Sequence, residues 1–307
     1  MSIDVSVLVP VHDRRDFIVQ AVVSACEQDS PPYEVMVVDD GSVDGSAEAV
    51  EGLAPLVRIL RQEHSGRSAA RNTGIRASSG DLVAFLDSDD VWLPGKLARQ
   101  LAIFERYPQV GMIAGHVCVV DRENEVLPED TRTCRRILDR LVREECSLEA
   151  LVRHSGIFTS SVIVRREVLD DVGLFDPDLD GNEDFDLWLR VARKWPVAVT
   201  PWPPVVRYRV HGGGTACRDM AQGMTRLVQR HLAMRPAVSR QARALLLVRQ
   251  ACGHRTLGEQ GQARSALVRA LGSAPFTAWG AGAGRLAVGS LLPTTVARAV
   301  GEKRRRV

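Results

Sequence analysis

Residues 82–90 read LVAFLDSDD. The apolar run is typical of a buried strand, and three carboxylates follow within four positions. Like charges packed this closely are unfavourable unless a positive group lies among them. The stretch therefore predicts a strand that ends at a charged site, and it raises the question of which cation this site holds.

Further strands and helices alternate around this stretch. Short apolar runs at 5–9, 34–39 and 56–60 predict strands, and helical periodicity at 17–28 and 68–78 fills the gaps between them. A further helix is expected after Pro94. This alternation predicts an α/β fold with a mixed, mostly parallel sheet that is flanked by helices.

The pattern changes in the second half of the chain. Strands are predicted at 110–120, 160–165 and 205–210, and helices at 147–154 and 183–195. Beyond residue 215 only helical patterns occur, at 239–252, at 261–271 and on an apolar stripe that runs from Met220 to Leu232 and includes His231. We expect one domain over residues 1–214 and a helical C-terminal extension over 215–307.

The two parts differ in charge. Residues 215–307 hold 16 Lys and Arg against 3 Asp and Glu, whereas residues 1–214 hold 24 basic and 35 acidic residues. Residues 275–307 mix aromatic and aliphatic side chains with arginines. This composition suits either peripheral contact with an anionic membrane or a basic cap packed on the acidic domain.

The composition also bears on location. The six cysteines are scattered without a C-x-x-C pair, and the sequence shows neither a basic leader nor an apolar run long enough to span a membrane. We expect a cytoplasmic protein, with the inner face of the cell membrane as its one candidate surface. No feature indicates a nucleic-acid partner.

Polar residues follow three of the four early strands. These tips are PVHD (10–13), DDGS (39–42) and DSDD (87–90), and ligands of open parallel sheets bind beyond such carboxyl ends. Asp44 or Ser42 is expected only to cap the next helix. No phosphate-binding glycine loop is present. Because carboxylates repel a diphosphate directly, a Mg²⁺ or Mn²⁺ ion on Asp87 and Asp89 is needed to hold one there. The alternative is an ordinary polar turn.

Four stretches together resemble one family. SVLVPVHDRRDFIVQAVVSACEQ, EVMVVDDGSVDGS, SGRSAARNTGIRASSGDLVAFLDSDD and NEDFDLWLRV look like the glycosyltransferases of family 2, in that family's order and spacing. The resemblance implies the GT-A (Rossmann-like) fold, with a nucleotide-sugar-binding half at 1–120 and an acceptor-binding half at 121–214. It implies transfer of a sugar, with inversion, from a nucleoside-diphosphate sugar, with a pyrimidine base expected, to a hydroxyl acceptor.

The resemblance also implies a role for single residues. The nucleotide would contact residues at the strand tips and on the following helix: Pro10, Val11, His12, Asp13, Asp40, Arg71, Asp87 and Ser88. Asp40 would accept a hydrogen bond from the base. The metal would lie on Asp89, with Asp87 and His211. Asp184 would be the general base. Apart from the resemblance, we expect Glu183 and Trp188 to shape the acceptor site and the core. His12, Asp13 and His64 depart from the Tyr, Asn and Asn that are common in the family.

Elementary helix physics gives a second expectation for Asp184. Asn182 is a good cap for the helix that follows, which places Asp184 in the first turn. The positive end of the helix should then lower the pKa of Asp184 and keep it ionised. A residue that merely complements the helix dipole would look the same in the sequence.

Two other functions share these features. A nucleotidyltransferase of a related fold also needs carboxylates and a metal. Its first loop is usually rich in glycine and in basic residues, and VPVHDRRDF has the basic residues but no glycine. A non-catalytic nucleotide-sugar-binding scaffold would have no need for Asp40, Asp89 and Asp184 together. The sequence therefore favours a metal-dependent glycosyltransferase that builds a bacterial cell-surface polysaccharide or glycolipid on a glycan or lipid-linked acceptor.

Overall fold

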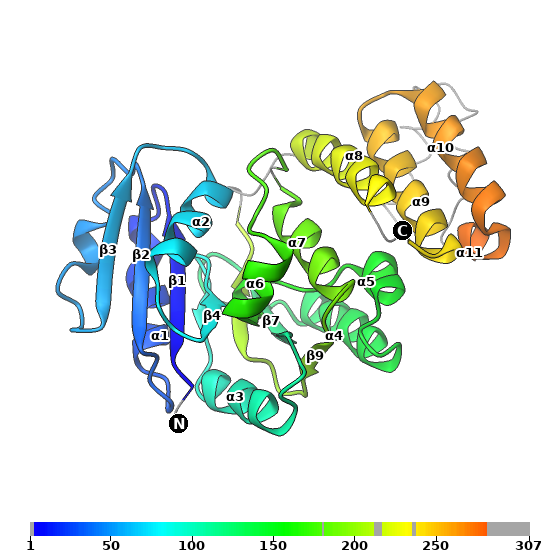
Figure 1. Cartoon of the computed structure of the whole chain (residues 1–307). Helices are drawn as coiled ribbons and strands as arrows, with labels where there is room; N and C mark the ends of the chain where they lie inside the picture. Colours follow the sequence, from blue (N-terminus) through cyan, green and yellow to red (C-terminus); the bar gives the residue numbers. More distant parts are fainter. Residues whose placement is uncertain (1–2, 180, 212–216, 235–237, 281–307) are drawn as a thin grey trace. The chain divides into compact units, whose positions relative to one another are not determined.

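The computed structural model describes residues 3–179, 181–211, 217–234 and 238–280. The chain divides into two compact units (Figure 1). The first comprises Met1–Pro177 and Glu183–Gly214, and the second comprises Asp178–Asn182 and Thr215–Val307.

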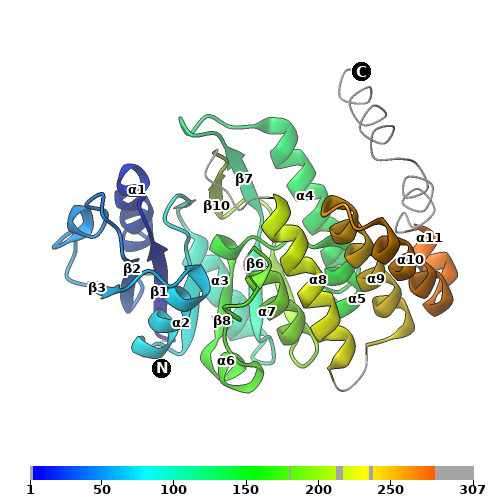
Figure 2. The same cartoon turned by 90° about the horizontal axis from the view of Figure 1, so that it is seen from above.

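The amino-terminal half of the first unit has the predicted alternation. Strands β1 (Val5–Val11), β2 (Glu34–Asp40), β3 (Val57–Gln62) and β4 (Leu82–Phe85) run parallel in the order β3-β2-β1-β4. Helices α1 (Arg15–Cys26) and α2 (Arg67–Ala77) cover opposite faces of these strands (Figures 1 and 2). Because all four strands are parallel, their carboxyl ends lie along one edge.

The sheet continues with strands from later in the chain. β8 (Ile163–Arg165) is antiparallel to β4 and to β6 (Met112–Gly115), and β9 (Val197–Thr200) is parallel to β6, which gives the order β3-β2-β1-β4-β8-β6-β9. Helices α3 (Lys96–Arg106) and α6 (Arg166–Val172) complete this part. The predicted α/β fold with a mixed, mostly parallel sheet is confirmed.

The prediction of one strand over residues 110–120 is wrong. The chain leaves the large sheet after Gly115, and β7 (Val117–Val120) pairs instead with β10 (Val206–Arg209), which also pairs with β5 (Val91–Trp92). A Cβ at Gly115 would lie 2.3 Å from Cγ2 of Val205, so only glycine allows the close approach at this crossing. The small sheet brings the end of β10 to the residues that follow β4.

Several elements are absent from the sequence-based predictions. Helix α4 (Pro128–Arg143) is not predicted, although it is strongly amphipathic, with Leu138 and Leu141 buried on one face and Pro128 at its start. The 3₁₀ turns η1 (Glu48–Val50) and η2 (Thr159–Ser161) carry no distinct signal. Helices α5 (Leu148–His154) and α7 (Glu183–Ala192) lie where the sequence predicts them.

The second unit is helical, with α8 (Cys217–Ala233), α9 (Arg240–Thr256), α10 (Gln260–Ser273) and α11 (Pro275–Gly280). Helices α9 and α10 pack through small residues, among them Ala244, Ala251, Ala266 and Ala270. His231 is fully buried on the apolar stripe of α8. Within the described ranges no helix is both long and apolar enough to cross a bilayer. Most of the segment expected to contact a membrane, residues 281–307, lies outside the described residues.

Candidate active site

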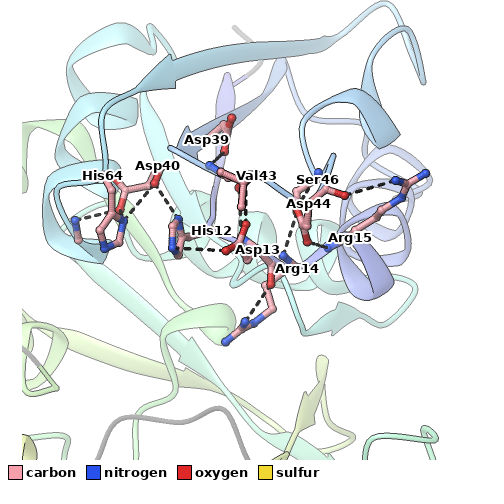
Figure 3. Close-up of polar contacts among 12 residues, drawn as sticks. His12, Asp13, Arg14, Arg15, Asp39, Asp40, Val43, Asp44, Ser46 and His64 are labelled. Atoms are coloured by element: carbon pink, nitrogen blue, oxygen red, sulfur yellow. Dashed lines mark hydrogen bonds and ion pairs between the residues drawn. The ribbon is translucent and has the colours of Figure 1, made fainter.

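The loops that follow β1 and β2 are tied together by side chains (Figure 3). The Asp13 backbone amide donates to Ser42 Oγ at 3.1 Å, and the Val43 amide donates to Asp13 Oδ1 at 2.9 Å. The Arg15 amide donates to Asp44 Oδ2 at 2.9 Å. Arg15 is the first residue of α1, so Asp44 bonds to the start of that helix. The 3₁₀ turn η1, which comes next in the chain, begins after Ala47 without a side-chain cap, so the expectation that Asp44 or Ser42 caps it is wrong. The two strand tips therefore form one rigid surface.

The carboxylate of Asp40 holds the loop between β3 and α2. The side chain is buried, and it accepts hydrogen bonds from Gln62 Nε2 at 2.7 Å, from the Ser65 amide at 2.8 Å and from the Gly66 amide at 2.9 Å. His64 Nδ1 also lies 2.9 Å from Asp40 Oδ2. Four partners match the acceptor capacity of a carboxylate. The predicted hydrogen bond to a nucleotide base therefore requires that one of these contacts opens.

Two imidazole rings stack on each other beside Asp40 (Figure 3). The ring centroids of His12 and His64 are 4.0 Å apart with an angle of 27° between the planes, and His12 Nδ1 lies 2.8 Å from the Asp40 carbonyl oxygen. The His12 side chain is 41% exposed and that of His64 is 60% exposed, so both rings are accessible to a planar ligand. Val11, in contrast, is buried in the core, and only its backbone can face a nucleotide.

The residues after β4 meet the end of β10. His211 Nε2 lies 2.8 Å from Asp89 Oδ2, and the guanidinium Nε of Arg14 lies 3.9 Å from the same oxygen. Ser88 is buried beside them. The structure thus brings together Asp89 and His211, which are separated by more than a hundred residues in the sequence. Their shared metal site stays a prediction.

Arg71 connects this turn to helix α7. Its buried guanidinium donates to Asp87 Oδ1 at 2.7 Å and to Glu183 Oε1 at 2.8 Å. Burial alone would lower the pKa of Arg71, but the charges of Asp87 and Glu183 outweigh burial and raise it. Arg71 therefore stays protonated, and two of its nitrogens are committed to the protein. Its predicted contact with the nucleotide remains a prediction.

Asp184 lies in the first turn of α7 with both oxygens engaged. Thr159 Oγ1 donates to Oδ2 at 2.9 Å, and the Phe185 amide donates to Oδ1 at 2.6 Å. Burial and the neighbouring charge of Glu183 raise the pKa of Asp184 to about 6, although Arg71 and the two hydrogen bonds act in the opposite direction. The expectation of a lowered pKa is wrong, because desolvation outweighs the helix end.

The two residues expected at the acceptor are buried. Trp188 packs its ring against Phe85 and Phe175, with centroids 5.9 Å and 6.1 Å away, and is 1% exposed. Glu183 is 2% exposed. In this structure Trp188 cannot touch an acceptor directly, so it shapes the core beneath the site. Asn182 is expected as the helix cap. Its side-chain Nδ2 donates to the Met220 carbonyl oxygen at 2.8 Å, and its capping role stays a prediction.

Three residues that contact the site have no recognisable signal in the sequence. Thr159 and Ser160 lie in the turn η2 and bond to Asp184 and to Asp90, respectively. Arg209 donates from Nε to the Asp89 carbonyl oxygen at 2.9 Å. A short run of hydroxyl residues before a strand carries no recognisable signal, and Arg209 reads as part of an ordinary strand.

The donor atoms at Asp89 and His211 fit one kind of metal site. Among the residues that the structure describes, no group of three or more His, Cys, Asp and Glu side chains is placed to hold a metal by itself. Mg²⁺ and Mn²⁺ commonly take one or two protein ligands and complete their shell with phosphate oxygens and water. The pair therefore suits a divalent cation that binds together with a diphosphate, and it does not suit a structural metal.

The fold and the strand-end carboxylates now have a family context. Residues 6–173 match the family model described as Glycosyl transferase family 2. The chain belongs to this family.

Curated relatives are similar over part of their length. An uncharacterized glycosyltransferase of Nostoc is 30% identical over 179 residues, which cover 56% of this chain and 54% of the relative. Bacillus subtilis TuaG, named for teichuronic acid biosynthesis, is 26% identical over 196 residues, which cover 62% of this chain and 72% of TuaG. The matched region spans 54% of the Nostoc relative. It spans 58% and 27% of two uncharacterized Rickettsia glycosyltransferases.

Solved structures share the GT-A fold. Residues 1–349 of S. aureus TarS, in complex with UDP-GlcNAc, superpose with a TM-score of 0.68 at 20% identity, covering 88% of this chain and 81% of TarS 1–349. The mannosyltransferase PcManGT of Pyrobaculum calidifontis, in complex with GDP-Man and Mn²⁺, gives a TM-score of 0.60 at 22% identity, covering 98% of this chain and 88% of that chain. At these identities the likeness shows the fold alone.

Replacing Arg71 by Met should lower the free energy of unfolding by roughly 3–5 kcal/mol, because buried Glu183 and half-buried Asp87 lose their shared cation. Urea unfolding at neutral pH measures this loss. Arg61→Met removes an exposed ion pair with Glu48 and is the matched control, with an expected change below about 1 kcal/mol. Equal losses in the two variants would contradict a structural role for the Arg71 bridge.

Proposed function

We propose that this family 2 protein transfers a sugar from a nucleoside-diphosphate sugar to a hydroxyl group, with inversion and with a divalent cation. One observation carries the proposal. Arg71 holds Asp87, which follows β4, and Glu183, which precedes Asp184, on a single guanidinium. Asp87, assigned to the donor, and Glu183, assigned to the acceptor, are thus both bonded to one buried cation.

The donor is assigned to residues 1–120, together with His211 at the end of β10. The exposed, stacked rings of His12 and His64 suit a planar base, and Asp89 and His211 suit a cation on the diphosphate. The complexes of TarS with UDP-GlcNAc and of PcManGT with GDP-Man and Mn²⁺ support a nucleotide-sugar and a divalent metal. When bound, the cation would neutralise charge on the departing nucleoside diphosphate. We keep a pyrimidine base as the first candidate.

The acceptor is assigned to residues 121–214, with Asp184 as the general base. The Asp184 carboxylate takes the proton of the acceptor hydroxyl while that oxygen bonds to the anomeric carbon and the diphosphate leaves from the opposite face. Thr159 and the Phe185 amide fix the orientation of the carboxylate, and its pKa of about 6 leaves it largely ionised at neutral pH yet basic enough to accept a proton.

The name of one relative bears on the biological acceptor. The name of TuaG, which refers to teichuronic acid biosynthesis, favours a glycan or lipid-linked acceptor in a cell-surface polysaccharide or glycolipid. A cytoplasmic site near the inner membrane face, reached through the basic residues 215–307, fits such an acceptor. A nucleotidyltransferase remains the rival, and release of pyrophosphate instead of a nucleoside diphosphate would identify it.

The pH dependence tests Asp184. A base acts only when it is deprotonated, so kcat/KM should be level above pH 7 and fall as the pH drops through about 6, approaching a tenfold loss per pH unit. Initial rates of nucleoside-diphosphate release over pH 4.5–8, with unfolding monitored in parallel, measure the profile. If kcat/KM falls only at about pH 4, the usual pKa of an aspartate, the assignment is contradicted.

Asp184→Asn keeps the size of the side chain and removes the base. Turnover should fall by about 10²–10⁴, whereas binding of the nucleoside diphosphate should stay near that of the unmodified chain. Asp170→Asn, at an exposed carboxylate of α6, is the control and should leave turnover unchanged. Turnover by Asp184→Asn at the level of this control would remove Asp184 from the mechanism.

A further inference from the structure

Asp90 is the most deeply buried carboxylate of the DSDD turn. It is 1% exposed, whereas the side chains of Asp87 and Asp89 are 29% and 25% exposed. Its oxygens face the protein, so it cannot touch a ligand. Burying a carboxylate beside two others costs folding free energy. Stability therefore does not explain the presence of Asp90.

One oxygen of Asp90 is connected to Asp87. Ser160 Oγ lies 2.5 Å from Asp90 Oδ2 and donates to it, while the same hydroxyl accepts the Asp87 backbone amide at 3.0 Å. Ser160 is itself held in place, because Trp92 Nε1 donates to its carbonyl oxygen at 2.8 Å. The hydroxyl therefore bridges the first and the last carboxylate residue of the turn.

The other oxygen of Asp90 is connected to His211. Oδ1 accepts the backbone amide of Arg209 at 2.8 Å, and Arg209 is the last residue of β10, two positions before His211. The Arg209 side chain returns to the turn and donates to the Asp89 carbonyl oxygen at 2.9 Å. The end of β10 and the turn are thus joined twice, and His211 Nε2 lies 2.8 Å from Asp89 Oδ2.

From this closed network we infer that Asp90 is a positioning residue, which acts with Ser160 to hold Asp87, Asp89 and His211 in the arrangement that binds a divalent cation together with a nucleoside diphosphate. The inference rests on the proposed function. Asp90 sets the position of residues from two sheets with one carboxylate. Contacts of this kind behind metal ligands commonly change metal affinity by 10- to 100-fold when they are removed.

The test titrates Mn²⁺ into the whole chain in the presence of a saturating nucleoside diphosphate, chosen as the tightest binder among UDP, CDP, GDP and ADP. Ser160→Ala should raise the half-saturating Mn²⁺ concentration about tenfold or more, and the metal-free affinity for the nucleotide should change by less than about twofold. Asp90→Asn should act in the same direction. Ser160→Thr, which keeps the hydroxyl, should restore the affinity for Mn²⁺.

Ser161→Ala is the matched control. Ser161 is equally buried in the same turn, but its hydroxyl bonds to the Phe158 carbonyl oxygen and the Gly115 amide. An unchanged Mn²⁺ requirement in folded Ser160→Ala, or an equal rise in Ser161→Ala, would overturn the inference. A wild-type chain that binds no nucleoside diphosphate with Mn²⁺ would instead overturn the proposed function, before any variant is compared.

Discussion

The site depends on the double ion pair of Arg71. A guanidinium that is 4% exposed is stable only when its charge is compensated, and here Asp87 and Glu183 share this task at 2.7 Å and 2.8 Å. Because Asp87 follows β4 and Glu183 begins α7, the pair fixes the helix that carries Asp184 against the end of the sheet. The position of the candidate base is therefore a consequence of charge compensation in the core.

The carboxylates around Arg71 differ in how their burial is compensated. Asp87 and Glu183 keep their partner, whereas Asp184 is desolvated beside Glu183 and its pKa rises to about 6. At Asp89, the neighbouring groups are His211 and Arg14, and the nearby Asp90 is held by a hydroxyl and a backbone amide. A cation bound together with a diphosphate would balance the carboxylates at these strand ends.

The sequence predicts the elements whose patterns are local. The strands β1 to β4 and the carboxylates at their ends follow from apolar runs that stop at polar tips, and Asp89 and His211 meet as the family resemblance implies. The break at Gly115 is not predictable, since it depends on the later approach of Val205. The raised pKa of Asp184 and the burial of Trp188 also depend on packing partners that are distant in the sequence.

We propose that Asp89 and His211 receive a cation together with a nucleoside diphosphate. Calorimetry with UDP, CDP, GDP and ADP, with and without Mn²⁺, tests it most directly, with Asp89→Ala as the variant. Asp81→Ala, at the opposite end of β4, where Asp81 accepts the Asp4 amide, is the control. The account predicts Mn²⁺-dependent binding of at least one nucleotide that is lost in Asp89→Ala and kept in the control. Nucleotide binding that is absent, or that is the same with and without Mn²⁺, would contradict it.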